Sequence, residues 1–535
     1  MARRGTLALG RHLARRRLLQ LGVLTAAAAS LTTEAWSSTS TTAAPRFSEY
    51  PFSLGVASGD PAPDGMVLWT RLAPEPLAED GLGGMPNRPV PVQFEVAEDD
   101  NFRRVVRRGT VVARPELAHS VHVELHGLRP GREYFYRFRV GRVESPVGRT
   151  RTLPPTGAPV GMLTLAFASC QRWSEGFYTA YRHMAEEDVD LVFHLGDYIY
   201  EDPINPTSNA RQQTVPDYFQ VEAITLPRYR TQYALYKMDP DLQAAHAAHP
   251  WVVTIDDHDV DDSWAADVPK ENSPTPTREE WLARRAAAFQ AFYEHQPVRL
   301  VSKPSGPDMQ LYRRFAYGDL AEFSVLDTRQ FRSDQACGDG RVIGCEDRLD
   351  PTRTMLGEEQ ERWLLDGLAR SRAQWNVLAQ QVFFCQRDFE EGPEQRFGMD
   401  EWSGYEPARA RVIEGFRRTS NPVVLTGDVH VHAAAEVKSD FNDPTSETLA
   451  VEFATTSISS GGDGADVTPA TLIRLKENPH LKFENQQRGY AVCTVTRRSW
   501  RTDFKILPYV VTPGAPISVR ASYVTEAGRP GLQEA

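Results

Sequence analysis

The chain has 535 residues, more than one ordinary domain core organises, so we expect two domains, one of them large. Hydrophobic residues make up 41% and charged residues 24%, which excludes a largely disordered, collagen-like or coiled-coil protein. The net charge is −11, and it becomes −16 without residues 1–44, which hold six Arg and one Glu. So acidic a chain lacks the basic footprint of a duplex-binding protein, and no nucleic-acid partner is expected.

The first 44 residues have the pattern of an export signal. Arg15-Arg16-Arg17-Leu18-Leu19-Gln20 precedes an apolar run over 21–29 that is too short to span a bilayer. This arrangement resembles a twin-arginine signal, which is read by the twin-arginine export machinery, and an ordinary export signal is the alternative. We predict a secreted protein without a transmembrane segment, cleaved after Ala28, Ala35 or Ala44, and leave open whether it stays with the cell wall.

Residues 45–155 have the pattern of a small all-β domain. Short strands with alternating apolar residues are separated by Gly and Pro turns, as in a β-sandwich of fibronectin-III type. The predicted strands cover residues 66–72, 90–96 and 122–125, and an aromatic strand ends at 138.

Residues 156–515 follow a different pattern, in which continuous apolar strands alternate with helices. This pattern predicts a layered α/β domain whose sheet is covered on both faces. The predicted strands are 163–168, 191–195, 251–255, 321–326, 375–378, 423–426 and 451–454, and the predicted helices are 176–188, 278–294 and 357–372. Residues 516–535 are expected to form a loosely held C-terminal tail.

The cysteines fit an exported protein. Cys337 and Cys345 enclose a polar, Gly-rich loop whose ends we expect to close in a disulfide in an oxidising compartment, and two free surface thiols are the alternative. Cys385 and Cys493 lie in apolar, strand-like runs and are expected to be inert core residues.

Side chains that can bind metals follow directly after four predicted strands. Ligands of open α/β sheets bind outside the carboxyl ends of the strands, so this placement predicts a two-metal hydrolase site. Each motif alone has a plainer explanation, such as a helix N-cap or a solvated acidic loop, and one of the last two histidines would be packed or exposed. The four motifs are Ser169-Cys170-Gln171, Gly196-Asp197-Tyr198-Ile199-Tyr200-Glu201, Asp256-Asp257-His258-Asp259 and Gly427-Asp428-Val429-His430-Val431-His432.

The order of these motifs resembles the calcineurin-like metallophosphoesterases. Ser-Cys-Gln ahead of Gly-Asp-Tyr-Ile-Tyr-Glu is similar to the PhoD-type alkaline phosphatases and phosphodiesterases, and the resemblance covers nearly the whole chain. It implies a metallophosphoesterase sandwich that hydrolyses phosphate mono- or diesters with a metal-bound oxygen as the nucleophile. A phospholipase D-like phosphodiesterase of the same fold, which would act on phospholipid, is the alternative. A surface-binding protein with a degenerate catalytic domain is the rival from another class.

The resemblance also implies one Fe3+ and two Ca2+ ions. Asp197 would bridge iron and calcium, and His258, beside Asp257, would contact the phosphate or protonate the leaving group. The wider superfamily usually has His in place of Asp428 and Asp in place of Cys170, which argues against a zinc or manganese pair. The catalytic residues implied are Asp197, Asp257 and His258, and the metal ligands implied are Cys170, Asp197, Tyr200, Asp257, Asp428 and His430.

Overall fold

The structure is a computed structural model that describes residues 47–535. Residues 47–535 belong to one compact unit, and the predicted export signal lies outside the described residues. Within the described part of the chain, every helix is too short or too polar to cross a membrane.

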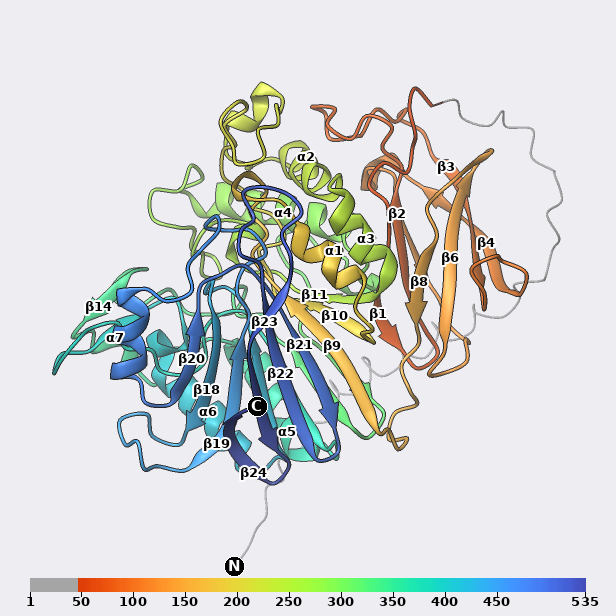
Figure 1. Cartoon of the computed structure of the whole chain (residues 1–535). Coiled ribbons are helices and arrows are strands. Elements are labelled where there is room, and N and C mark those ends of the chain that lie inside the picture. Colours follow the sequence, from red (N-terminus) through yellow and green to blue (C-terminus); the bar gives the residue numbers. More distant parts are fainter. Residues whose placement is uncertain (1–46) are drawn as a thin grey trace, which may run out of the picture. The chain divides into compact units, whose positions relative to one another are not determined.

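The larger of two packed sheets has ten strands, which come from segments spread over most of the chain (Figure 1). The strands β9, β10 and β11 are parallel neighbours at its centre, so their carboxyl ends lie at one edge. In spatial order the strands are β24 (Arg529–Glu534), β23 (Ser518–Glu526), β22 (Ser499–Ile506), β21 (Gly489–Thr496), β9 (Met162–Ala168), β10 (Leu191–His194), β11 (Pro250–Val253), β1 (Val56–Ala62), β2 (Gly65–Arg71) and β5 (Ser120–Glu124).

The second sheet has seven strands and packs face to face with the first. Leu165 and Phe193 of the first sheet share a buried core with Phe323, Leu425 and Phe453 of the second. These strands alternate little in polarity because both faces of each sheet are covered. In spatial order the strands are β12 (Arg313–Tyr317), β13 (Ala321–Val325), β15 (Trp375–Ala379), β17 (Pro422–Thr426), β19 (Thr448–Ala454), β18 (His432–Lys438) and β20 (Leu481–Asn485).

Helices cover the outer faces of both sheets. The first four pack on the ten-stranded sheet through a core that includes Met184, Tyr233 and Phe289, whereas the next two pack on the seven-stranded sheet through Leu368 and Val412. The last helix contacts β20. The helices are α1 (Thr179–Ala185), α2 (Leu226–Lys237), α3 (Pro240–Ala248), α4 (Arg278–His295), α5 (Gly357–Arg370), α6 (Glu406–Phe416) and α7 (Pro469–Glu477).

The N-terminal part is all β, as predicted, but one of its layers continues the large sheet. β1 pairs in parallel with β11, and Gly59 allows this approach because a Cβ there would lie 2.7 Å from the carbonyl oxygen of Trp251 in β11. Met66 and Leu68 of β2 pack against Tyr136 of a separate five-stranded sheet. That sheet contains β3 (Val90–Ala97), β4 (Val105–Ala113), β6 (Glu133–Val140), β7 (Val143–Glu144) and β8 (Gly148–Arg151). The domain boundary at residue 155 stays a prediction.

The layered α/β fold is confirmed, whereas the expected C-terminal tail is replaced by two strands. β23 and β24 pair with each other, and β23 pairs with β22. Tyr523 of β23 is buried in the core between the two large sheets. The Pro and Gly residues on both sides of β23 conceal a strand that carries a buried aromatic residue.

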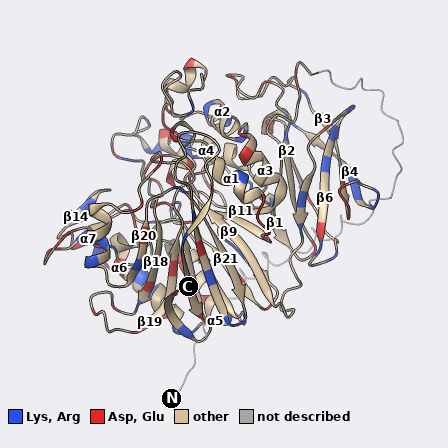
Figure 2. Cartoon of the chain, in the orientation of Figure 1, with Lys and Arg blue, Asp and Glu red and all other residues tan. Residues whose placement is uncertain are grey.

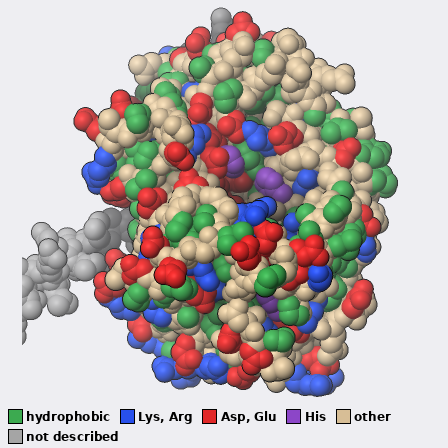
Figure 3. Space-filling view, turned by 90° about the vertical axis from the view of Figure 1, so that its left-hand side faces the viewer, with side chains coloured by type: hydrophobic (Ala, Val, Ile, Leu, Met, Phe, Trp, Pro, Cys, Tyr) green, Lys and Arg blue, Asp and Glu red, His purple; other side chains and the backbone are tan. Residues whose placement is uncertain are grey.

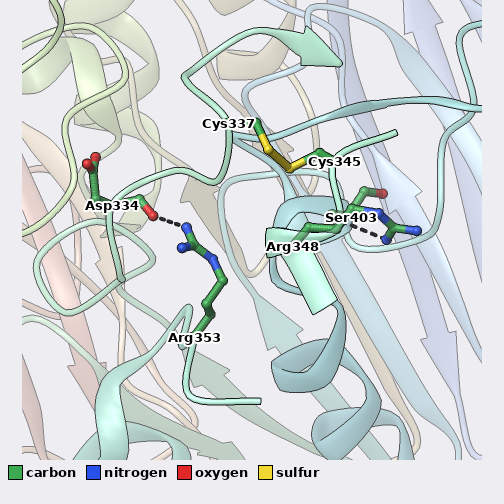
Figure 4. Close-up of a disulfide and its surroundings, with 6 residues drawn as sticks. All are labelled: Asp334, Cys337, Cys345, Arg348, Arg353 and Ser403. Atoms are coloured by element: carbon green, nitrogen blue, oxygen red, sulfur yellow. Dashed lines mark hydrogen bonds between the residues drawn. A yellow bond between two sulfur atoms is a disulfide. The ribbon is translucent and has the colours of Figure 1, made fainter. Parts of the chain in front are cut away.

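The predicted disulfide between Cys337 and Cys345 is present (Figure 4). It closes the loop that contains β14 (Arg341–Ile343), which pairs with β16 (Arg396–Gly398). Cys345 belongs to a small core with Ala336, Phe397 and Met399. Cys385 and Cys493 are buried free thiols, as expected for core residues.

Replacing both cysteines of the disulfide by serine is expected to lower the free energy of unfolding by about 2–3 kcal/mol, because a short closed loop is released in the unfolded chain. Denaturant unfolding of the mature protein measures the difference. Wild-type protein kept in reductant is the control and should match the Cys337→Ser/Cys345→Ser variant. Equal stability of the oxidised wild type and the variant would contradict the expectation.

Candidate metal centre

The predicted strand-end motifs meet at one edge of the two packed sheets. β9, β10 and β11 end there in the first sheet, and β17 ends there in the second, with Gly427 packed against Ser169 and Leu195. Acidic residues are visible in the loops beside α4 (Figure 2). Asp261, in the loop after β11, pairs with Arg284 of α4. Figure 3 shows a hollow on one face in which acidic, basic and histidine side chains gather.

One group of possible ligands combines four different donor types. The ligand atoms of Cys170, Asp197 and His430 all lie within 4.8 Å of one another. The Tyr200 hydroxyl donates to Asp197 Oδ2 over 2.9 Å and lies 3.1 Å from His430 Nε2. A thiol, a carboxyl, a phenol and an imidazole therefore converge in this group.

Two further groups contain the remaining predicted residues. Asp197 also lies with Asp257 and His258, and Asp257 lies with Asp256 and Asp428, again with ligand atoms within 4.8 Å. Asp197 is thus shared between the mixed-donor group and the second group. All seven predicted site residues are brought together, and Asp256 is an addition to them.

The backbone at this edge adopts unusual conformations. Cys170, Asp197, Asp428 and His430 have φ values of 61°, 54°, 60° and 55°, in the left-handed region that non-glycine residues rarely occupy. Such strain persists where surrounding packing fixes it, and it concentrates at functional sites. Each of these residues is therefore held in a conformation that aims its side chain into the cluster at a cost to local stability.

Asp259 ties two of the strand-end loops together. Its buried carboxyl group accepts hydrogen bonds from the backbone N–H groups of Asp197, Tyr198, Ile199 and Asp256, at 3.0–3.3 Å. Burial raises its pKa to about 7, despite these hydrogen bonds. The loop after β10 and the loop after β11 are thus held together by the Asp259 carboxyl group, whose oxygens are used in these hydrogen bonds.

The two histidines after β17 have different environments. The backbone carbonyl of His430 accepts hydrogen bonds from Arg488 Nη1 and Thr456 Oγ1, at 2.9 and 3.1 Å, which fixes this residue in the cluster. His432 is buried, with Nδ1 accepting from the Thr456 backbone N–H and Nε2 3.2 Å from the Lys505 carbonyl oxygen. Only the first of the pair therefore faces the candidate ligands.

The cluster carries more negative charge than its surroundings balance. Burial and the nearby Asp257 carboxylate raise the pKa of Asp197 well above its usual value, and burial raises that of Asp428 to about 7 although Arg329 opposes it. Asp256 Oδ2 and Asp257 Oδ1 are buried without a hydrogen-bond partner. Bound cations would stabilise the ionised carboxylates, so these residues fit a metal centre.

Burial also disfavours the charged forms of Cys170, Tyr200 and His430 in the mixed-donor group. Burial and the charge of Asp197 raise the pKa values of the Cys170 thiol and the Tyr200 phenol well above their usual values. Burial lowers the pKa of His430 to about 3, so its imidazole is neutral and can bind a metal. The thiol and phenol would need a strongly charged cation to become ligands at neutral pH.

His258 is oriented by a carboxylate that is fully buried. Its Nδ1 lies 2.8 Å from Glu201 Oε2, and the other Glu201 oxygen accepts from the Asp262 backbone N–H. Burial acts to lower the pKa of His258, but the Glu201 and Asp257 carboxylates outweigh it and hold the pKa well above its usual value. Lys270 Nζ, 3.5 Å from Glu201, adds a counter-charge.

Several residues that hold the cluster were not assigned from the sequence. Glu201 and Asp259 lie inside the motifs, but neither position distinguishes a buried anchor from a ligand. Ser460, whose hydroxyl lies 2.9 Å from the Tyr200 hydroxyl and donates to the Cys170 carbonyl oxygen, follows no motif. Asp400 follows the short strand β16, which the sequence pattern does not reveal.

Two family models, one curated relative and one solved structure match most of this chain. The family model described as "PhoD-like phosphatase" matches residues 165–504, and that of the "PhoD-like phosphatase, N-terminal domain" matches residues 37–154. The chain is 52% identical to "Alkaline phosphatase D" of Bacillus subtilis (strain 168) over 498 residues, which cover 92% of this chain and 84% of that protein. The solved structure titled "Structure of PhoD" superimposes with a TM-score of 0.88 at 52% identity, covering 92% of this chain and 93% of the other.

Gly196→Ala is expected to lower the free energy of unfolding by about 2–3 kcal/mol more than Gly392→Ala. Both glycines have nearly the same φ, 106° and 105°, so the backbone strain is matched. A Cβ on Gly196 would lie 2.3 Å from Asp256 Cβ, whereas one on Gly392 would have no atom within 4 Å. Denaturant unfolding compares the two, and equal losses would contradict the close packing of the strand-end loops.

Proposed function

The chain belongs to the PhoD-like phosphatase family, and on that premise we propose that it is a metal-dependent hydrolase of phosphate esters. The observation that carries the proposal is the convergence of the buried Cys170, Asp197 and Tyr200 with the half-buried His430. Carboxylates that follow strands of both sheets lie next to this group. Cations and the phosphate of an ester would therefore meet where the carboxyl ends of these strands lie. The name of the Bacillus relative, alkaline phosphatase D, supports the same reaction for this chain.

The donor types support iron at one position and calcium at the others. Cys170, Tyr200 and His430, with Asp197, offer thiolate, phenolate, imidazole and carboxylate donors, the mixed set that the resemblance to the PhoD-type phosphatases associates with a single Fe3+ ion. Asp197, Asp257 and Asp428 offer the carboxylate oxygens that suit two Ca2+ ions. When bound, such cations supply the Lewis acidity and positive charge that hydrolysis of an anionic ester requires.

His258 is the candidate proton donor to the leaving group. In its contact with Glu201, the Nδ1–H of His258 donates to the carboxylate. Nε2 is therefore the nitrogen that can reach a substrate. The side chain is 18% exposed, so solvent and substrate can reach it while Glu201 holds its Nδ1. Protonation of the departing oxygen by His258 would assist the release of a poor leaving group.

A polar cavity next to Tyr200, through Arg172, supports small polar esters over phospholipids as substrates. Arg172, whose guanidinium lies 4.9 Å above the Tyr200 ring, also lines a cavity of about 550 Å³. The lining is mainly polar, with no continuous apolar wall for an acyl chain. It consists of Arg172, Ser174, Glu175, Pro203, Asn205, Ser208, Asn209, Ala210 and Gly462.

We also propose that the protein works outside the cytoplasm after export by the twin-arginine route. The adjacent Arg15 and Arg16 ahead of an apolar run support the route. The disulfide between Cys337 and Cys345 supports an oxidising compartment, because such bonds are rare where cellular thiols keep cysteines reduced.

Asp197→Asn is expected to lose bound metal and activity together, because one shared carboxylate serves two groups of ligands. Elemental analysis of the purified mature protein measures iron and calcium. Hydrolysis of p-nitrophenyl phosphate, its bis-ester and phosphatidylcholine is recorded with and without a calcium chelator. Asp366→Asn, an exposed carboxyl on α5, is the control and should retain both metal and activity. Turnover by a metal-free Asp197→Asn protein would contradict the proposal, and preferred hydrolysis of phosphatidylcholine would favour the lipid alternative.

His258→Gln is expected to slow hydrolysis of an alkyl phosphate by about a hundred- to ten-thousandfold and that of p-nitrophenyl phosphate much less, because p-nitrophenolate leaves without a proton. The ratio of kcat values for the two esters, measured with both metals confirmed as bound, reports this difference. Equal losses on both esters would assign His258 to phosphate binding instead of proton donation.

A further inference from the structure

The guanidinium of Arg329 contacts four carboxylates at the edge of the metal centre. Its Nε lies 2.5 Å from Asp256 Oδ1 and its Nη1 lies 2.8 Å from Asp400 Oδ2. Its Nη2 lies 3.4 Å from both Asp257 Oδ1 and Asp428 Oδ1. Three of these carboxylates form the oxygen-only group of possible ligands described above.

These carboxylates come from segments that are far apart in the sequence. Asp256 and Asp257 follow β11 of the ten-stranded sheet, whereas Asp428 follows β17 of the seven-stranded sheet. Arg329 itself follows β13 of the seven-stranded sheet, and Asp400 follows β16. A single side chain therefore connects the two sheets at the point where the candidate ligands meet.

Arg329 is not available to bind a substrate. Its side chain is 0% exposed, and each of its three nitrogens is already within reach of a carboxylate. A phosphate ester would have to displace Asp256 or Asp400 to reach it. Its role is therefore to position other groups.

The contacts divide the four carboxylates into two kinds. Asp256 and Asp400 make the short contacts, and Asp400 is also held by Arg332 Nη2 at 2.6 Å and Gln335 Nε2 at 2.8 Å. The charge of Arg329 and Arg332 lowers the pKa of Asp400 well below its usual value, although burial opposes this. Asp256 and Asp400 thus anchor the guanidinium from two sides.

Asp257 and Asp428 make the longer contacts, which leave them free to bind a cation. Asp257 Oδ2 accepts from the Ser263 backbone N–H over 2.7 Å, so Oδ1 is the oxygen that remains, and it has no hydrogen-bond partner. Nη2 of Arg329 lies equally far from this oxygen and from Asp428 Oδ1. The rigid, planar fork of arginine fixes such a spacing, which a lysine ammonium does not.

We propose that Arg329 is a positioning residue that sets the calcium-binding geometry, by holding Asp257 and Asp428 at a fixed separation and by pairing with Oδ1 of Asp256. The inference rests on the proposed function, in which these carboxylates bind calcium. In this proposal the Arg329 guanidinium is a permanent positive charge beside the calcium ions. Iron binding by the mixed-donor group does not depend on Arg329.

The experiment compares Arg329→Lys with the wild type as purified mature holoenzymes. Calcium affinity is measured by titration against a chelator of known strength, and iron by elemental analysis and by the visible absorption of its thiolate and phenolate ligands. We expect calcium to bind about ten- to a hundredfold more weakly in Arg329→Lys, as for other residues that support metal ligands, with iron content and absorption unchanged. Arg409→Lys is the matched control, because Arg409 is equally buried but contacts Ser403 and Glu406.

A second variant, Asp400→Asn, carries the test if the lysine variant fails to fold. It leaves Arg329 in place and removes the anchor at Nη1, so calcium binding should weaken while iron is retained. Unchanged calcium affinity in the folded variants would overturn the inference, and so would the joint loss of iron and calcium, which would indicate a general structural role. A wild-type protein that binds neither metal would overturn the proposed function, and the inference with it.

Discussion

Negative charge buried at one edge of two packed sheets is the constraint on which the rest of the site depends. Asp197, Asp256 and Asp257 are almost inaccessible to water, and Asp428 lies beside them. Carboxylates so placed repel one another and resist ionisation unless positive charge lies among them. Arg329 provides one such charge within the protein, and the unpartnered oxygens mark where further positive charge is required.

The fold meets this constraint by bringing strand ends from two sheets together. Parallel strands place their carboxyl ends at one edge, and face-to-face packing brings the end of β17 against the ends of β9 and β10. The chain then turns through left-handed backbone conformations at Cys170, Asp197, Asp428 and His430. Asp259 and Arg488 hold these turns through hydrogen bonds to the backbone, so strain at the site is balanced by its supports.

The sequence locates the candidate ligands better than it locates the residues that support them. Motifs directly after buried strands identify these candidates because strand direction brings them to one edge, and the disulfide follows from a short polar loop between two cysteines. Asp400 and Ser460 were missed because their roles depend on contacts between residues far apart in the chain. Arg329 also follows a strand, but its four partners come from three other segments, so its role depends on the fold. β23 was missed because Pro and Gly on either side outweighed its apolar pattern.

The most direct measurement of the central claim is anomalous X-ray diffraction from crystals of the mature protein grown with calcium. Data collected on both sides of the iron absorption edge identify iron by element and position. The account predicts one iron peak among Cys170, Asp197, Tyr200 and His430, with non-iron density at calcium distances from Asp257 and Asp428. Iron elsewhere, or these side chains bonded only to one another or to water, would contradict it.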